Sequence, residues 1–572
     1  MASFIRVNSD VLVLGAGGAG LRAAIESQTS GAKTVVVSKS VFGKAHTVMA
    51  EGGIAASIGD VDPKDSWEVH FSDTVREGVY IGDWRFAEIL AKEAPERVYE
   101  LESYGALFDR TPEGKIMQRA FGAHTYRRLC HVGDKTGLEI IQTLKDKVMA
   151  LGIEVMDEIF ITRLATHNGK VIGAIGIMMR TGDIIAFSAK STIIATGGSG
   201  RIFKTTSNSW ESTGDGIALA FRAGAELKDM EMVQFHPTGM VYPLGVKGLL
   251  VTESVRGEGG MLFNARGERF MRKYSPKRME LDARDVVARA VYAEIMEGKG
   301  TKHGGVYLDI SHKGKAFIMK KLPGMYEQFK ELAGVDIIKE KMEVAPTVHY
   351  HMGGIAISSE DGRSAVEGLF AAGEATSGLH GANRLGGNSL ADILVFGKRA
   401  GSGAAAYSAS EEMMGIPDEK VAEEIDRISS FLTEKIKINP YREMNELREC
   451  MSANVGIIRE EKSLMKAVRT ISEINERMYG MGVEGGLCYN PALYGMLELQ
   501  NMLLVAECIA KSALERKESR GAHTRSDYPA KEREWKVNII CSNSNGRISL
   551  RKRKVAAMPD ELLKIVGDEV YQ

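Results

Sequence analysis

A glycine-rich turn near the start of the chain has the residue types and the spacing of a dinucleotide site. Asp10 to Leu14 is a short apolar run that ends in glycines, which is typical of a buried parallel strand. Gly15, Gly17 and Gly20 follow as G-x-G-x-x-G, and Ala19 to Gln28 is a predicted helix. The first glycine permits a tight turn, the second lets backbone approach a pyrophosphate, and the third lets helix and strand pack closely. The helix N-terminus offers free N–H groups to phosphate, so we predict a dinucleotide site here.

The second predicted strand, Lys33 to Val37, departs from the usual dinucleotide pattern at its end. That strand commonly ends in an acid that binds the ribose hydroxyls, whereas Ser38 and Lys39 stand here. Ser38 can still hydrogen-bond a hydroxyl. The dinucleotide prediction therefore stands, but NAD is less favoured as the ligand.

The next segment, FGKAHTVMAEGG over residues 42–53, brings a histidine close to the glycine turn. It resembles the flavoprotein subunit of the succinate dehydrogenase and fumarate reductase family. In that family the histidine before the threonine is bonded to the 8α-methyl group of FAD. The resemblance implies FAD as the cofactor, bonded covalently through His46. Lys44-Ala45 stands where Arg-Ser is more usual, so the sequence leaves open whether the bond forms.

The resemblance implies further contacts with FAD in three other parts of the chain. A second strand-and-glycine turn runs from Thr192 to Gly198, and Asp215 opens a helix in GDGIALAFRAGA. The stretch GLFAAGE ends in Glu374, at the place where such flavoproteins bind the ribityl chain. The complete predicted set for the cofactor is Gly15, Ala16, Gly17, Gly18, Ala19, Ser38, Lys39, His46, Thr47, Gly52, Gly53, Thr196, Gly197, Asp215, His349, Tyr350, Glu374, Arg384, Ser389 and Leu390.

Further blocks resemble the dicarboxylate site of the same family and occur in the family's order. They are QFHPTG, TESVRGEGG, LDARD, and the pair HYHMGG and HGANRLGGNSL. A site for fumarate and succinate needs cationic or neutral donors for two carboxylates, and arginine matches a carboxylate at two points. By resemblance, the predicted substrate-binding residues are His236, Thr252, Glu253, His349, Arg384 and Phe121.

The resemblance also implies that Arg284, in LDARD, delivers a proton to the substrate carbon. The pKa of arginine is about 12 or higher, but a carbanion-like carbon is far more basic, so the acid needs to be well placed rather than strong. Glu253 and Arg256 are three residues apart and can resupply the proton. The predicted catalytic residues are Arg284, Glu253, Arg256 and His236.

Three alternatives compete with this function. L-aspartate oxidase shares much of the architecture, but it carries a glutamate facing the substrate amine where this chain has Phe121, and it lacks a covalent histidine. Adenylylsulfate reductase would not need HYHMGG and the paired arginines. A non-catalytic FAD electron-transfer subunit would not need Arg284, Glu253 and Arg256.

Composition and cysteine content limit the remaining classes. The chain has 572 residues and a formal charge of −1, which gives no indication of nucleic-acid binding. The five cysteines form no C-x-x-C pair, so we expect no iron–sulfur cluster, zinc or other metal in this chain. There is no run of eighteen apolar residues and no signal-like N-terminus, so we expect no spanning helix and a cytoplasmic location.

The order of the strands and helices that position these residues predicts an α/β fold. We expect a Rossmann-like FAD-binding domain with an inserted α+β capping domain, then a helical domain and a small C-terminal domain. Residues 152–190 alternate short apolar runs with turn signals, which predicts antiparallel strands before a separate strand at Thr192 to Ala195. The predicted boundaries are 1–236 and 348–410 for the FAD-binding domain, 237–347 for the cap, 411–517 for the helical bundle and 518–572 for the C-terminal segment.

The predicted partners follow from the same resemblance. Electrons must cross to another subunit, and the family implies an iron–sulfur protein. Beyond it the sequence leaves two options: a membrane anchor, which would hold the complex on the inner face of the membrane, or a soluble thiol-oxidising subunit. The direction of the reaction, the subunit stoichiometry and any bound monovalent cation are not determined by the sequence.

Overall fold

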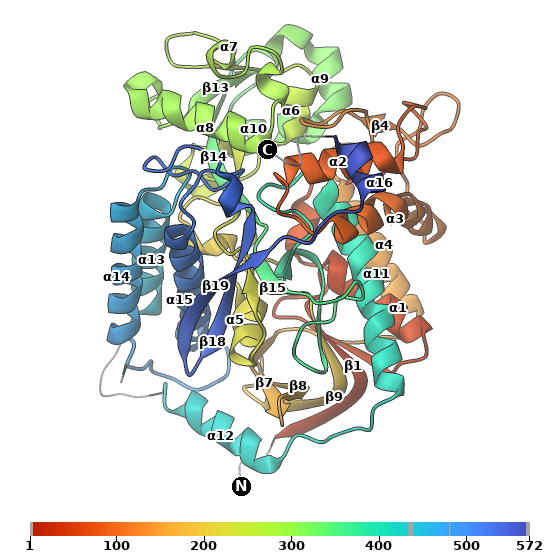
Figure 1. Cartoon of the computed structure of the whole chain (residues 1–572), viewed down its shortest axis with the longest axis vertical. Helices are drawn as coiled ribbons and strands as arrows, with labels where there is room; N and C mark the ends of the chain where they lie inside the picture. The colour runs from red at the N-terminus through yellow and green to blue at the C-terminus, as the bar shows by residue number, and fades with distance from the viewer. Residues whose placement is uncertain (1–3, 433–438, 480, 568–572) are drawn as a thin grey trace.

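The computed structural model describes residues 4–432, 439–479 and 481–567, and its largest sheet lies at the base of the molecule in Figure 1. The strand order is β6-β2-β1-β9-β8-β7, and β16 also pairs with β9. β1 runs parallel to both β2 and β9, as a dinucleotide fold requires. The bounds are β1 Ile5–Leu14, β2 Thr34–Val37, β6 Glu154–Met156, β7 Ile159–His167, β8 Lys170–Met178, β9 Ile184–Ile194 and β16 Leu369–Ala371.

One long strand, β9, replaces two elements that the sequence predicts separately. β9 pairs antiparallel with β8 at Ile184 to Ser188, and it pairs parallel with β1 over nearly its whole length. The separate strand predicted at Thr192 to Ala195 is therefore the end of β9 and not a new element. The antiparallel β7-β8-β9 portion and the parallel portion are parts of one sheet.

Helices cover the nucleotide-binding sheet and join it to the rest of the domain. α1 follows β1 directly and packs against α11, which also contacts α3 and the sheet (Figure 1). The region between Asp65 and Leu101 contains two helices, and Asp83 caps the second by accepting from the Arg85 N–H. The bounds are α1 Gly18–Thr29, α2 Trp67–Glu77, α3 Trp84–Ser103, α4 Thr136–Ala150, α5 Asp215–Arg222 and α11 Asn388–Ala409. A small sheet, β3-β5-β4, comprises Ile54–Ala55, Leu129–Cys130 and Gln118–Arg119.

The middle of the chain forms a cap with its own apolar core, at the top of Figure 1. Its sheet has the order β11-β14-β13-β12. The strands are β11 Val233–Met240, β12 Met261–Phe263, β13 Val306–Asp309 and β14 Met342–His351, and the helices are α6 Glu253–Gly257, α7 Met271–Tyr274, α8 Arg284–Glu294, α9 Lys315–Lys321 and α10 Pro323–Ala333.

Two long strands carry the chain into the cap and back. The predicted cap boundaries at residues 236 and 347 fall within β11 and β14, and His236 is paired with Thr347 across the two strands. Continuous hydrogen-bonded backbone therefore runs through both predicted boundaries, with no loop at either one. The exact limits of the domains stay a prediction, and residues 1–3, 433–438, 480 and 568–572 of the predicted domains lie outside the described residues.

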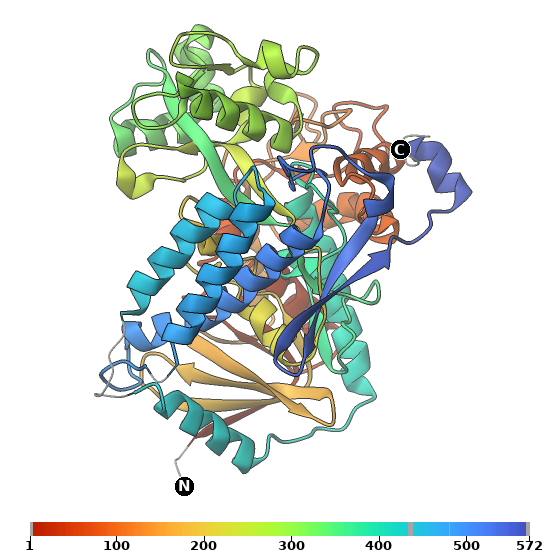
Figure 2. The same cartoon turned by 60° about the vertical axis from the view of Figure 1, so that its left-hand side comes forward.

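The helical region lies beside the nucleotide-binding domain, and three of its helices stand side by side in Figures 1 and 2. The bounds are α12 Asp418–Ser429, α13 Pro440–Asn454, α14 Glu461–Arg477 and α15 Pro491–Glu515. Met444, Met451, Met496 and Met502 are buried, so these methionines are core residues. Within the described residues, α15 alone is long and apolar enough to cross a membrane, and 72% of its apolar window is buried inside the fold. Its composition is thus that of a core helix.

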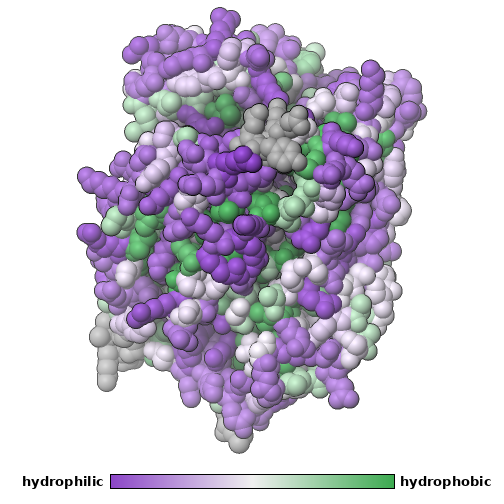
Figure 3. Space-filling model, viewed as in Figure 1, coloured by the Kyte–Doolittle hydropathy of each residue, from purple (hydrophilic) through white to green (hydrophobic). Residues whose placement is uncertain are grey.

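The C-terminal segment adds a hairpin to a third sheet, β17-β15-β10-β18-β19. The bounds are β10 Leu227–Lys228, β15 Gly354–Ala356, β17 Thr376–Ser377, β18 Val537–Ser544, β19 Arg547–Lys554 and α16 Asp560–Val566. The basic run Arg551 to Lys554 lies on β19, an edge strand, where Arg551 and Arg553 both pair with Glu226. Figure 3 shows that the face viewed in Figure 1 is largely hydrophilic, with apolar patches mainly in its middle.

Candidate functional site

The glycine turn after β1 has the space that a pyrophosphate needs. Gly15 has a φ of +115°, and a Cβ there would lie 2.2 Å from the Ala195 carbonyl oxygen. A Cβ on Gly20 would lie 1.9 Å from the Gly15 carbonyl oxygen, so the first and third glycines are required by close packing. Gly17, in contrast, has no atom within 3.6 Å of a hypothetical Cβ. Gly17 is therefore not crowded by other residues, and it lines a cavity at the N-terminus of α1, where backbone donors can meet phosphate.

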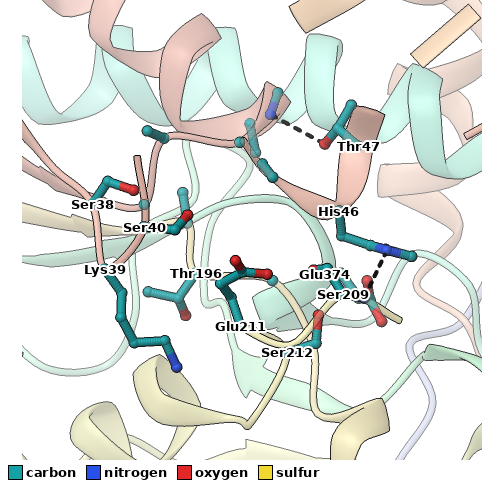
Figure 4. Close-up of a pocket in the computed structure, with 18 of the residues that line it drawn as sticks. Ser38, Lys39, Ser40, His46, Thr47, Thr196, Ser209, Glu211, Ser212 and Glu374 are labelled. Carbon is teal, nitrogen blue, oxygen red and sulfur yellow. Dashed lines mark hydrogen bonds between the residues drawn. The ribbon is translucent and has the colours of Figure 1, made fainter. Parts of the chain in front are cut away.

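A cavity lies at this turn, and Figure 4 shows part of its lining. His349 and Tyr350 also line it. Its lining combines the β1 turn, the end of β2, the loop around His46, the β9 turn and the residues near Glu374. Of the predicted cofactor residues, Gly52, Gly53 and Arg384 are not in the lining. Those that line it are Gly15, Ala16, Gly17, Gly18, Ala19, Ser38, Lys39, His46, Thr47, Thr196, Gly197, Asp215, His349, Tyr350, Glu374, Ser389 and Leu390.

Sequence reasoning missed several residues of the same wall. Ser40, Ser209, Glu211 and Ser212 line the cavity, and Figure 4 shows them among the labelled side chains. Ser40 could have been inferred from its position two residues after Ser38. The 209–212 loop carries no sequence signal of its own, because only the fold brings it next to His46.

The Ser38 hydroxyl and the Lys39 ammonium group follow the end of β2, and they have different surroundings. Lys39 Nζ lies 2.6 Å from Asp215 Oδ2 and 2.9 Å from Glu498 Oε1. These two carboxylates offset the charge of Lys39 and engage its donors. Ser38 is buried and also lines the cavity, and its hydroxyl is neutral. Ser38 is therefore the better placed of the two side chains to bind a hydroxyl at the usual ribose position.

His46 lies in a short 3₁₀ turn, His46–Met49, and faces the cavity (Figure 4). The Ser209 N–H donates to Nδ1 at 3.3 Å, and the Asn208 side-chain amide lies 3.1 Å from Nε2. Burial, and then the charge of Arg201, lower the pKa of His46 to about 4. The imidazole is therefore neutral at physiological pH, which is the state required of a nucleophile.

Glu374 is a half-buried residue of the cavity lining. One of its oxygens accepts the His351 backbone N–H at 3.0 Å. Burial raises the pKa of Glu374 to about 7. A carboxyl group in this state has polar atoms to offer to a hydroxyl-bearing ligand, which fits the ribityl contact implied by the sequence.

The predicted dicarboxylate residues converge near His349, a residue of the cavity lining. They come from β11, α6, α8, β14 and the loop before α11. The rings of His236 and His349 are 5.2 Å apart between centroids. His236, Thr252, Glu253, Arg256 and Arg384 are each no more than 2% exposed, and Arg284 is 6% exposed. The structure therefore brings together five parts of the chain in one dry, cationic site.

The two histidines of this site are neutral and held by hydrogen bonds. His236 Nδ1 lies 3.0 Å from the Thr238 carbonyl oxygen, and His349 Nδ1 lies 2.8 Å from Ser207 Oγ. Burial lowers the pKa of both rings well below the ordinary value. The charge of Arg284 lowers the pKa of His236 further. At His349 the further lowering comes from His236 and then from Arg284. The nearby positive charge thus comes from the arginines.

Arg284, Glu253 and Arg256 form a connected ionic cluster. Arg284 Nε donates to Glu253 Oε2 at 2.8 Å, and Arg256 Nη2 lies 3.6 Å from the same oxygen. Gly122 N donates to Glu253 Oε1 at 2.7 Å. Burial acts to raise the pKa of Glu253, but Arg284 and Arg256 outweigh it and lower the pKa to about 2. Glu253 is therefore an ionised carboxylate between two guanidinium groups.

Gln234 links Arg284 with Arg384, and sequence reasoning missed it. Its Oε1 accepts from Arg284 Nη1 at 3.2 Å and from Arg384 Nη2 at 3.1 Å. Its Nε2 donates to Asn383 Oδ1 at 2.8 Å. A neutral amide thus holds two cations in place. Its position two residues before His236 in a strand was the available signal, because alternate residues share a face.

Arg384 and Phe121 complete the surroundings. Arg384 Nη1 donates to Ser389 Oγ at 3.1 Å, and its guanidinium lies 4.7 Å from the centre of the Tyr350 ring. Burial, and then Arg284, lower the pKa of Arg384 to about 9. The Phe121 ring fills the space beside Gly52 and Gly386, where a Cβ on either glycine would be 2.8 Å from it. An apolar ring at this point cannot pair with an ammonium group.

Family models match most of the chain. Residues 10–390 match a family described as an FAD binding domain, and residues 444–562 match one described as Fumarate reductase flavoprotein C-term. The first match spans the nucleotide-binding domain and the cap. The residues of the cavity and of the ionic cluster all lie within this match, apart from Ile393 in α11.

Whole-chain relatives give the same assignment. The chain is 50% identical over 532 residues to a fumarate reductase (CoM/CoB) subunit of Methanothermobacter marburgensis, with 93% of this chain and 96% of that protein covered. It is 42% identical over 558 residues to the succinate dehydrogenase flavoprotein subunit of Coxiella burnetii, with 93% and 94% covered. The solved structure of Mycobacterium smegmatis Sdh1 in complex with UQ1 is 49% identical, with a TM-score of 0.89 and coverage of 98% and 96%.

Proposed function

Because the chain belongs to the family of succinate dehydrogenase and fumarate reductase flavoprotein subunits, we infer that it interconverts fumarate and succinate with FAD as its cofactor. It acts as the catalytic subunit of an electron-transfer complex. The observation that supports the chemistry most directly is the buried contact of Arg284 with Glu253, next to two histidines and Arg384. A dry site with several cationic donors suits a small dianion.

The substrate carboxylates are held by residues from both sides of the site. Thr252 comes from the cap and Arg384 from the nucleotide-binding domain, whereas His236 and His349 lie on β11 and β14, the two strands that connect these domains. Arg384 provides the two-point fork, and its contacts with Gln234 and Ser389 restrict the orientation of that fork. Positively charged and hydrogen-bonding donors on one carboxylate polarise the alkene toward hydride addition, and the rigid fork keeps it oriented.

Arg284 donates the proton to the substrate carbon in fumarate reduction and accepts it back in succinate oxidation. Glu253 and Arg256 return that proton, because Glu253 contacts Arg284 directly and Arg256 lies on the far side of the same carboxylate. The low pKa of Glu253 keeps it ionised between Arg256 and Arg284, so it does not retain the proton that it passes between them. Both directions use the same groups, so potentials and partners set the physiological direction.

FAD fits the cavity from the Gly17 turn to His349, and when bound it supplies or accepts hydride at N5. Backbone donors at the start of α1 would hold the pyrophosphate, Ser38 a ribose hydroxyl and Glu374 the ribityl chain. His46 is neutral, half-buried and oriented by Asn208 and Ser209, which supports a covalent bond from His46 to the flavin.

The electron partner is an iron–sulfur protein subunit. One relative, 50% identical to this chain, is named for CoM/CoB. A solved structure that is 49% identical contains UQ1. Similarity alone gives no preference between a quinone-reactive membrane anchor and a soluble thiol-oxidising subunit. The complex is cytoplasmic. If the partner is a membrane anchor, the complex is attached to the inner face of the membrane through it. Mass spectrometry of the subunits that co-purify with this chain, together with its fractionation with or without membranes, decides between them.

An electron-donor assay tests the catalytic function. The purified complex, supplied with reduced methyl viologen, should oxidise the dye only when fumarate is added, and malonate should inhibit the reaction. L-aspartate with oxygen should yield no hydrogen peroxide, because Phe121 offers nothing to the substrate ammonium. Peroxide formation from L-aspartate without fumarate turnover would contradict this function and favour an aspartate oxidase.

A further inference from the structure

Arg119 connects the flavin-side loop to the cap. It ends β4, on the nucleotide-binding side, and is mostly buried. Its Nε donates to the Gly52 carbonyl oxygen at 2.9 Å, and Nη2 donates to the Glu51 carbonyl oxygen at 3.1 Å and to that of Gly133. Three donors of one guanidinium are thus bound to main-chain oxygens of the domain that carries the cavity.

The remaining arm of Arg119 crosses to the cap. Nη1 donates to Ser254 Oγ at 3.0 Å, and Ser254 is 1% exposed. Ser254 lies in α6 between Glu253 and Arg256. The Thr252 hydroxyl donates to Ser254 Oγ at 3.3 Å and accepts from the Ser254 N–H, so it caps α6. The contact therefore reaches the first turn of the helix that presents Thr252 and Glu253.

The same segment makes a second contact with α6 only three residues later. Gly122 N donates to Glu253 Oε1 at 2.7 Å. Residues 119–122 thus bind α6 through one side-chain bond and one backbone bond, at adjacent residues of the helix. α6 has only five residues, and its position depends on such contacts because so short a helix has little stability of its own.

We propose that Arg119 is a positioning residue that aligns α6, and with it Thr252 and the proton-relay carboxylate Glu253, to the loop at Glu51–Gly53. The proposal rests on the proposed function for its kinetic consequences, and its structural part is independent of that function. Arginine is required because its planar group directs donors toward three carbonyls and one hydroxyl at once, whereas lysine presents a compact ammonium group. A small displacement of α6 would lower the rate strongly, because catalytic groups tolerate little misplacement.

A double-mutant cycle in the holoenzyme tests this role. We expect Arg119→Lys to lower kcat for fumarate reduction at least about tenfold, while the malonate dissociation constant changes less than about threefold. Ser254→Ala should lower kcat by a smaller factor, and adding it to Arg119→Lys should cause little further loss, because both changes remove the same bond. Ser254→Thr keeps the hydroxyl and should restore most of the rate. Arg127→Lys is the matched control, since Arg127 is in the same segment but is exposed and pairs with Asp62.

Hydrogen exchange supplies a readout that needs no turnover. In FAD-loaded protein, Arg119→Lys and Ser254→Ala should each accelerate exchange of the α6 amides, and Arg127→Lys should not. Multiplicative losses of kcat in the double mutant, or α6 exchange equal to that of the wild type, would overturn the proposal. If the wild type lacks fumarate turnover while the exchange pattern appears, the proposed function fails and the coupling of Arg119 to α6 stands.

Discussion

Nε of Arg284 donates to Oε2 of Glu253 at 2.8 Å, and both side chains are buried. Arg284 begins α8 and Glu253 begins α6, so the contact joins the N-terminal ends of two cap helices. The arginine proposed as the acid thereby contacts the carboxylate that is proposed to resupply its proton. This relationship leads to the first two predictions.

Arg284→Ala should remove nearly all turnover in both directions. A positioned acid–base group contributes about 10²–10⁴-fold, so we expect a loss within or above that range. Malonate binding should fall much less, because the role of Arg284 belongs to the transition state. Viologen-linked fumarate reduction and dye-linked succinate oxidation measure the two directions, with Arg278→Ala, an exposed arginine of the cap, as the control. More than about a tenth of wild-type turnover would exclude Arg284 as the acid and point to His349.

Glu253→Gln should lower turnover while inhibitor binding stays nearly intact. Glutamine keeps the shape of the side chain and can still accept from the Gly122 N–H, but it cannot accept a proton as a carboxylate does. Reduction of the flavin by the partner should proceed at the wild-type rate, because that step does not use the relay. Stopped-flow absorbance of the flavin separates the two steps. Slower flavin reduction would show that Glu253 acts elsewhere than in the relay.

Glu253 should also contribute to stability in a defined pH range. Its pKa is about 2 in the folded protein against an ordinary value of 4.5, so the folded state holds fewer protons than the unfolded state between these values. The stabilisation is complete above pH 4.5 and is lost as pH falls toward 2, with a change on the order of 1 kcal/mol by pH 3.5. Urea unfolding at pH 5.5 and 3.5 should show a smaller pH dependence for Glu253→Gln than for the wild type. Equal pH dependences would contradict the depressed pKa.

Arg384→Lys should weaken dicarboxylate binding. Lysine keeps the charge but loses the fork that contacts Ser389 and Gln234, and charged hydrogen bonds contribute about 1.5–3 kcal/mol. We expect the inhibition constants of malonate and oxaloacetate to rise by about 10- to 150-fold. Arg363→Lys, an exposed arginine of the same domain, is the control. An unchanged inhibition constant would remove Arg384 from the clamp.

His46→Ser should release the flavin upon denaturation. The wild-type band on a denaturing gel should fluoresce after acid precipitation, because FAD stays bonded to the protein. The variant should lose this fluorescence and still fold, with FAD held non-covalently in the cavity. His167→Ser, at the exposed end of β7, should keep the bond. A non-fluorescent wild-type band would show that no covalent bond forms, and would favour the aspartate oxidase alternative.

The sequence by itself determined the local architecture of the cofactor site. Gly15, Gly17 and Gly20 act within one turn, so their spacing along the chain already specifies the open position at Gly17. The helix after β1 and the two helices around Asp83 were predictable for the same reason. The resemblance added His46 and the dicarboxylate blocks, and the structure places those blocks in one buried site. In each case the relevant signal lies within a few neighbouring residues.

Only the tertiary structure decided which distant groups meet. Lys39, predicted as a cofactor residue, pairs with Glu498 on α15, and Gln234 links Arg284 with Arg384. β9 is one strand because β8 and β1 both pair with it. In the sequence, turn-like signals precede this strand and glycines follow it. Arg119 reaches Ser254 across 135 positions of the sequence. The physical reason is that hydrogen bonds and ion pairs depend on distances in space, and packing of the cap and the helical region sets those distances after the local elements have formed.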